Sequence, residues 1–144
     1  GFRTTVDQAF EQVLERCADP TLRPEGTWIS PQMRAAYRRL HELDYAHSFE
    51  TWEGDQLVGG LYGVALWRVF FGEPMFSAAR DASKVALHAL VQASLAQKVR
   101  LIDCQVDSEH LRSLGARSLP RSEFVRELAA ATGDSQPGAS WRKA

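Results

Sequence analysis

Apolar residues recur at helical spacing near the start of the chain, with mostly polar residues between them. The residues on this face are Val6, Phe10, Val13, Leu14 and Cys17. The segment Thr5-Val6-Asp7-Gln8 has the form of a capping box, in which two side chains satisfy the first backbone N–H groups of a helix. This pattern predicts a helix that starts with the capping box and ends at Asp19-Pro20, because the residue before a proline disfavours helical geometry.

A second amphipathic helix is predicted after the loop that follows. Ser30 is a good N-cap, and Pro31 suits the first helical position, where a backbone N–H has no partner to lose. The apolar residues behind this cap repeat every three or four positions, and the spacing predicts a buried stripe. They are Met33, Tyr37, Leu40 and Leu43.

The pattern then changes to apolar runs of strand length. Residues 47–53 and 56–66 predict two strands, and Gly54-Asp55 between them is typical of a hairpin turn. Residues 69–71 predict a third strand, which Gly72-Glu73-Pro74 is expected to end because glycine and proline weaken a strand interior.

A third helix is predicted to begin at Asp81 or Ser83. Its apolar residues are Val85, Leu87, Leu90, Val91 and Leu95. Residues 100–106 then predict a strand with a fully apolar start. A short helix over 108–115, a short strand near Ser118 and a helix over 122–131 follow.

This order of elements predicts an α/β (α+β) fold with a mixed, mostly antiparallel sheet flanked by helices. The strand followed by residues 107–116 also resembles the end of the GNAT acyltransferase fold. We therefore expect a single GNAT-like domain over residues 1–132. The Gly/Ser/Pro-rich segment 133–144 is expected to be a flexible tail.

The composition is that of an ordinary globular protein. With 144 residues and a formal net charge of -1, the chain has no overall attraction to nucleic acid or to anionic membranes. No apolar run reaches about 18 residues, so no membrane span is expected. The start also lacks the pattern of a secretory signal. Cys17 and Cys104 are expected to be reduced core thiols, which fits a cytoplasmic protein.

Polar residues in apolar strands are the candidates for chemistry. Asp103 and Gln105 are two apart on a predicted strand and face the same side, and Glu73 follows another strand. Such groups either tie a strand to a loop or belong to a functional site. No spacing typical of a metal site is present, and Ser77 and Ser83 have no evident His/Asp partner.

Longer motifs cover nearly the whole chain. They lie at residues 2–18, 25–29, 41–43, 47–52, 57–64, 71–73, 75–77, 82–84, 101–106, 110–116 and 120–121. In this order they resemble the leucyl/phenylalanyl-tRNA–protein transferase family. The resemblance implies a cofactor-independent, metal-independent enzyme of the N-degron pathway of protein degradation. Such an enzyme moves Leu, Phe or Met from the 3′ end of aminoacyl-tRNA to the N-terminal Arg or Lys of a protein.

The resemblance also implies roles for individual residues. Asp103 and Gln105 would be catalytic, since they would orient or deprotonate the attacking amine. Glu73 would face the α-ammonium of the aminoacyl group or the N-terminus of the acceptor. The residues that would bind substrate, mostly by lining an amino-acid pocket, are Leu61, Met75, Ser77, Leu87, Leu90 and Trp28. Periodicity alone makes the leucines core residues, and the tryptophan could stack on the terminal adenosine or pack in the core.

The chain departs from the family's pattern at several positions. Trp67 stands where the family usually has glycine, Pro74 stands where it has serine, and Lys98-Val99 replaces a glycine-containing turn. Family members carry a domain before the position of Phe2. The chain is therefore expected to be an excised C-terminal domain or a short relative.

The sequence leaves two other functions possible. One is a CoA-dependent GNAT N-acetyltransferase, although residues 76–84 offer no glycine for a pyrophosphate-binding loop. The other is a catalytically degenerate relative that binds peptides or proteins.

Overall fold

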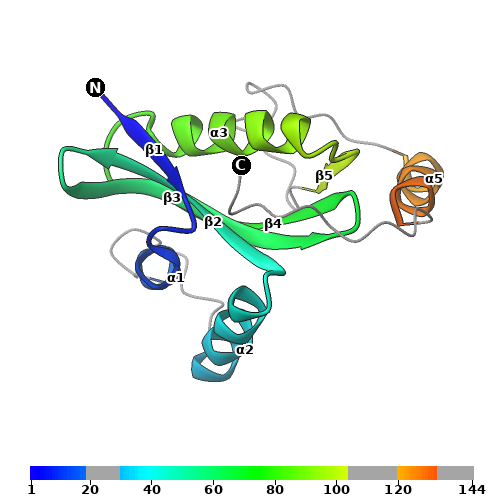
Figure 1. Ribbon diagram of the computed structural model, residues 1–144, viewed down its shortest axis with the longest axis horizontal. Helices are drawn as coiled ribbons and strands as arrows, with labels where there is room; N and C mark the ends of the chain where they lie inside the picture. Colours follow the sequence, from blue (N-terminus) through cyan, green and yellow to red (C-terminus); the bar gives the residue numbers. More distant parts are fainter. Residues whose placement is uncertain (19–29, 104–119, 133–144) are drawn as a thin grey trace.

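The computed structural model describes residues 1–18, 30–103 and 120–132. A five-stranded sheet in the order β1-β2-β3-β4-β5 forms its centre (Figure 1). The strands are β1 (Arg3–Val6), β2 (Ala46–Glu53), β3 (Gln56–Leu66), β4 (Val69–Ser77) and β5 (Leu101–Asp103). Neighbouring strands are antiparallel except β4 and β5, which are parallel. The predicted mixed, mostly antiparallel sheet is confirmed.

Helices cover both faces of this sheet. Helices α1 (Phe10–Cys17) and α2 (Pro31–Glu42) lie on one side and α3 (Ala82–Ala96) on the other, whereas α5 (Arg121–Thr132) lies beside β4 and β5 (Figure 1). The cluster under α1 includes Phe10, Val13, Leu14, Tyr62 and Phe76. The cluster under α3 includes Phe49, Leu61, Phe70, Leu87 and Leu90. Successive strand residues point to opposite faces, so one sheet supplies both clusters.

The helix start predicted at residues 5–8 is wrong. Residues 3–6 form β1, which pairs with β2, and α1 begins only at Phe10. The Thr5 hydroxyl donates a 2.6 Å hydrogen bond to the Glu50 carboxylate across the strands. Asp7 then turns the chain with a φ of 56°. The Thr5 hydroxyl therefore binds an acceptor on a neighbouring strand and does not cap a helix. The local sequence does not reveal this long-range contact.

Helix α2 begins as predicted but is not buried as predicted. The Ser30 hydroxyl accepts a 3.1 Å hydrogen bond from the Met33 N–H, and Pro31 occupies the first turn. No residue of α2 is fully buried, and Met33 and Leu43 are 40% and 48% exposed. Tyr37 and Leu40 pack only partly against the cluster under α1. The helix extends away from the sheet, so the domain covers only part of its apolar stripe (Figure 1).

Strand β4 does not end at the predicted break. It continues through residues 72–74 to Ser77. Leu61 of β3 pairs with Met75, but Gly63 pairs with Gly72, so β4 holds one more residue than β3 in this interval. A β-bulge of this kind accommodates a proline inside a strand, because the extra residue needs no ladder hydrogen bond.

The other elements agree with their predictions where the structure describes them. Helix α3 begins after Asp81, although that side chain makes no capping hydrogen bond. Strand β5 begins at Leu101, and α5 agrees within a residue at each end with the helix predicted over 122–131. The short helix predicted over 108–115, the strand near Ser118 and the tail from 133 lie outside the described residues.

Two turns hold a residue other than glycine in the left-handed backbone region, which costs free energy. Trp67, in the turn between β3 and β4, has a φ of 53°, and Lys98, after α3, has a φ of 60°. This left-handed region suits glycine, whereas other L-residues crowd their own carbonyl there. After α3 the Val99 N–H bonds the Ser94 carbonyl at 2.8 Å and the Lys98 N–H bonds the Leu95 carbonyl at 3.2 Å. These bonds form a Schellman motif with Lys98 at its left-handed position.

Replacing Lys98 by Gly is therefore expected to raise the free energy of unfolding by about 1 kcal/mol, since the left-handed conformation then carries no Cβ. Urea unfolding of the two proteins measures this difference. Lys98→Ala is the matched control. It removes the lysine side chain but keeps the Cβ, so it is expected to give no gain.

Candidate active site

Four residues predicted to line an amino-acid pocket lie together under α3. Leu61 and Met75 are cross-strand partners on β3 and β4, and Leu87 and Leu90 of α3 belong to the same cluster. Leu61 and Leu90 are almost fully buried, whereas Met75 is partly buried. These residues thus form part of the hydrophobic core, with Met75 at its partly accessible margin.

Asp103 ends the described part of β5. It pairs in parallel register with Phe71 of β4, and it is partly buried. The backbone of Glu73 lies on β4 two residues beyond Phe71. The sheet therefore brings Asp103 beside the strand that carries Glu73 and Met75. Gln105 and Trp28 lie outside the described residues.

Ser77 holds the turn that leads into α3. Its hydroxyl donates to the Ala79 carbonyl at 2.7 Å and accepts from the Ser83 N–H at 3.1 Å. The buried Thr51 hydroxyl donates to the Ala82 carbonyl at 2.9 Å. These contacts fix where α3 starts, and with it the height of Leu87 and Leu90 above the sheet.

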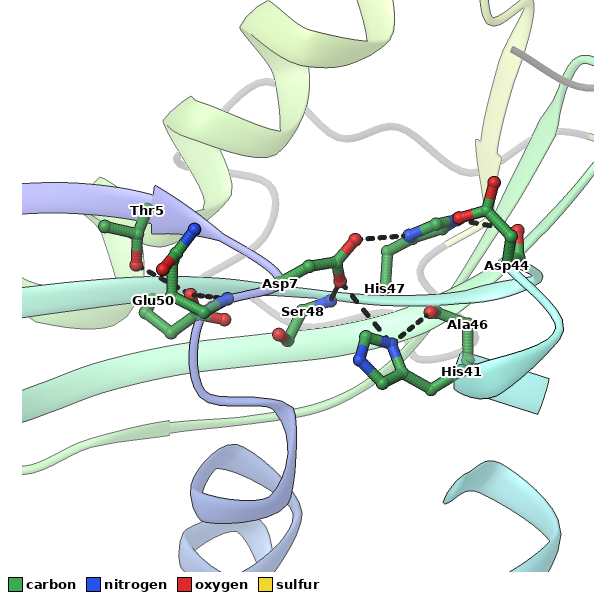
Figure 2. Close-up of polar contacts among 9 residues, drawn as sticks. Thr5, Asp7, His41, Asp44, Ala46, His47, Ser48 and Glu50 are labelled. Carbon is green, nitrogen blue, oxygen red and sulfur yellow. Dashed lines mark hydrogen bonds and ion pairs between the residues drawn. The ribbon is translucent and has the colours of Figure 1, made fainter. Parts of the chain in front are cut away.

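A polar network that the sequence analysis missed lies at the start of β2 (Figure 2). His47 is fully buried, with its Nδ1 2.7 Å from Asp7 Oδ2 and its Nε2 3.0 Å from the Asp44 carbonyl oxygen. The Ser48 N–H donates to Asp7 Oδ1 at 2.9 Å, and His41 Nδ1 lies 2.9 Å from the Ala46 carbonyl oxygen. The network therefore joins the β1–α1 connection to the end of α2.

Glu50 is a further polar side chain on β2, beyond His47 and Ser48 (Figure 2). It is fully buried, and its Oε1 accepts hydrogen bonds from the Thr5 hydroxyl and from the Gln8 N–H at 3.0 Å. Within the described residues, its Oε2 has no hydrogen-bond partner. Burial raises the pKa of Glu50, and the nearby Ser48 hydroxyl and the hydrogen bonds from Thr5 and Gln8 offset this effect only in part.

The only sequence signal for this network was the run of polar residues in a predicted strand, His47, Ser48, Glu50 and Thr51, all of which are buried. In the sheet order, β3 and β4 separate this strand from β5. The network therefore supports the packing of α1 and α2 on the sheet, at a distance of two strands from Asp103.

A pH prediction follows from the raised pKa of Glu50. Between the ordinary glutamate pKa and the raised value, the folded protein holds a proton that the unfolded chain has released, so this group's contribution to stability falls as pH rises. We expect the stability advantage of Glu50→Gln, which is neutral at all pH values, over the natural chain to grow as pH rises from about 4 to about 8 and to reach about 1–3 kcal/mol. Urea unfolding across this range measures the difference. If the free energies of unfolding of the two proteins change with pH in parallel, the pKa of Glu50 is not raised in the folded protein.

No group of His, Cys, Asp or Glu side chains in the described ranges could hold a metal ion. Among the described helices, none is long and apolar enough to cross a bilayer.

Comparison with protein families gives one match over most of the chain. The family described as leucyl/phenylalanyl-tRNA protein transferase matches residues 1–129. A relative from Chromobacterium violaceum with this name is 50% identical over 140 residues, which cover 97% of this chain and 60% of the relative. A relative from Anaeromyxobacter sp. (strain Fw109-5) is 56% identical over 129 residues, covering 88% of this chain and 54% of the relative. The chain thus spans just over half the length of these relatives.

Solved structures with the same fold are GNAT acetyltransferases. An aminoglycoside acetyltransferase from an uncultured soil metagenomic sample, in complex with sisomicin, has a TM-score of 0.65 at 13% identity, covering 83% of this chain and 91% of that one. A GNAT-family acetyltransferase from Staphylococcus aureus Mu50 has a TM-score of 0.62 at 14% identity, and the match covers 85% of this chain and 88% of that one. At such low identity the likeness concerns the fold alone, and it confirms the predicted GNAT-like architecture.

Proposed function

Because the chain belongs to the leucyl/phenylalanyl-tRNA protein transferase family, we propose that it transfers Leu, Phe or Met from aminoacyl-tRNA to the N-terminal Arg or Lys of a protein. The observation that carries this proposal is the family match over residues 1–129. The low-identity likeness to acetyltransferases supports the fold and gives no reason to prefer acetyl-CoA as the donor.

The reaction is aminolysis of an ester. The α-amino nitrogen of the acceptor forms a C–N bond with the carbonyl carbon of the aminoacyl group, and the bond from that carbon to the ribose oxygen breaks. The attacking nitrogen loses a proton, and the ribose oxygen gains one. The products are an extended protein with a new peptide bond and a tRNA with a free terminal hydroxyl. A protein catalyst can orient the amine, accept its proton and stabilise the developing oxyanion.

Asp103 is the candidate for orienting and deprotonating the amine. Its partly buried position beside β4 supports this role, because a carboxylate shielded from bulk water attracts an ammonium group more strongly. Glu73 adds a second acidic residue on β4, and Gln105 would share the handling of the amine. Acidic residues suit an acceptor whose N-terminal residue is Arg or Lys, since both its α-ammonium and its side chain are cationic.

The donor side chain would enter from the margin of the cluster under α3. Leu61, Met75, Leu87 and Leu90 offer the apolar surface that Leu, Phe and Met share. Such surfaces discriminate weakly, by about 1–3 kcal/mol per methylene, which supports acceptance of several apolar amino acids. Trp28 would stack on the terminal adenosine. Charged tRNA is a cytoplasmic substrate, so the proposal assigns the reaction to the cytoplasm.

The test is to incubate the chain with leucyl-tRNA and a peptide that begins with Arg, and to follow the peptide by mass spectrometry. We expect addition of one leucine to the peptide N-terminus. An N-acetylated copy of the peptide, which has no free amine, is the control and should remain unchanged. Binding of the peptide without leucine transfer indicates a degenerate relative, and acetylation of the peptide with acetyl-CoA indicates an N-acetyltransferase. Either result contradicts the proposal.

A further inference from the structure

The first turn of α3 rests on two neighbouring strands through one residue, Ala82. The Thr51 hydroxyl of β2 donates a 2.9 Å hydrogen bond to the Ala82 carbonyl oxygen, and both residues are fully buried. Gly59 of β3 is the cross-strand partner of Thr51. A Cβ added at Gly59 would lie 2.6 Å from the Ala82 Cβ, so the helix can come this close only to a glycine.

The distance between the start of α3 and the sheet depends on this contact. Asp81, at the cap position of α3, makes no side-chain capping hydrogen bond. Ser77 accepts a hydrogen bond from the Ser83 N–H and ties the helix to the end of β4, whereas Thr51 and Gly59 tie it to β2 and β3. A hydroxyl can approach a carbonyl oxygen at 2.9 Å because it donates, but a methyl group stays about 3.3 Å or more away. Thr51 and Gly59 therefore set how closely α3 lies over the sheet.

Helix α3 connects this contact to the apolar cluster of the candidate site. Leu87 and Leu90 lie about 7.5 Å and 12 Å beyond Ala82 along the helix axis. A packed helix shifts as one body, so a lift of its first turn also moves both leucines. They belong to one cluster with Leu61 and Met75 of the sheet. A lift of α3 therefore widens the space between these two pairs of side chains.

We propose that Thr51 and Gly59 are positioning residues that set which donor side chain the chain prefers. This inference rests on the proposed function, in which the side chain of Leu, Phe or Met enters the cluster under α3. A helix held close to the sheet favours the smaller leucine. A raised helix gives the larger phenylalanine ring more room and leaves leucine with fewer contacts, because dispersion attraction falls steeply as a gap opens.

The test compares kcat/KM for transfer from phenylalanyl-tRNA and from leucyl-tRNA to the same Arg-initiated peptide. Thr51→Val keeps the shape of the side chain but replaces the hydroxyl by a methyl group. Gly59→Ala adds a Cβ that would overlap Ala82, so it lifts α3 further. We expect the phenylalanine-to-leucine ratio of kcat/KM to rise about threefold in Thr51→Val and about tenfold in Gly59→Ala. Thr51→Ser, which keeps the hydroxyl, should retain the ratio of the natural chain.

Gly60→Ala is the matched control. Gly60 follows Gly59 on β3 but lies toward α1, where an added Cβ would lie 3.1 Å from the Val13 and Phe76 side chains. This substitution is expected to cost stability without lifting α3. Transfer of the two amino acids should therefore change in proportion, and the ratio should stay that of the natural chain.

The ratio separates a positioning role from a merely structural one. If folded Thr51→Val has a lower melting temperature but the ratio of the natural chain, the inference is wrong and the proposed function stands. Thr51→Val alone decides the question if Gly59→Ala does not fold. If the natural chain transfers neither amino acid, the proposed function is wrong and this inference falls with it.

Discussion

Replacing Asp103 by Asn is expected to lower kcat/KM for leucine transfer to an Arg-initiated peptide by about 10²- to 10⁴-fold, the usual contribution of a positioned acid or base. Asparagine has nearly the same shape but neither accepts the proton of the amine nor attracts an ammonium group. The residue ends β5 and is only partly buried, so the substitution should leave the fold intact.

The measurement is the initial rate of leucine transfer at low peptide concentration, with the melting temperature of each protein recorded beside it. Asp103→Ala should behave like Asp103→Asn. Asp55→Asn is the matched control, because Asp55 is an exposed aspartate in the turn between β2 and β3. A folded Asp103→Asn protein with activity within about threefold of the natural chain would remove the catalytic assignment.

Replacing Gly63 by Ala is expected to lower the free energy of unfolding by about 3 kcal/mol, at the upper end of the usual cost of overpacking. A Cβ at this position would lie 2.4 Å from the Phe71 carbonyl oxygen and 2.5 Å from the Phe70 ring. The first of these is a backbone atom, so relief requires that β4 itself move away from β3. Because Phe71 is also the partner of Asp103, leucine transfer should fall as well.

Gly60→Ala is the graded comparison for this substitution. A Cβ at Gly60 would lie 3.1 Å from the Phe49 carbonyl oxygen and from the Val13 and Phe76 side chains. We expect a loss of about 1 kcal/mol, because at this distance each neighbour needs to shift by only a few tenths of an ångström. Urea unfolding of the three proteins measures both losses. Equal stability of Gly63→Ala and the natural chain would show that β3 and β4 are not as close as described.

The sequence predicted elements well where the determining interactions are local. Ser30 and Pro31 identified the start of α2, and Gly54-Asp55 identified the turn between β2 and β3. The predictions from the sequence failed where long-range contacts decide the structure. Thr5 was expected to cap a helix, but Glu50 of β2 takes its hydroxyl. Gly72-Glu73-Pro74 was expected to end a strand, but a bulge lets β4 continue.

The candidate site was predicted by resemblance more than by pattern. Periodicity alone makes Leu87 and Leu90 core residues, and the structure agrees, since both belong to the cluster under α3. Their grouping with Met75 depends on strand register, which a single sequence does not reveal.

The extra residue in β4 also constrains how this domain can diverge. Deleting one residue between Gly72 and Met75 would remove the bulge and leave Met75 opposite Leu61, because β3 and β4 would then hold equal numbers of residues in this interval. Deleting both residues would place Met75 opposite Tyr62, and Met75 would turn toward α1 while Phe76 turned toward α3. Descendants of this domain can therefore lose the bulge in one step, but any further shortening of the interval would have to be matched on β3.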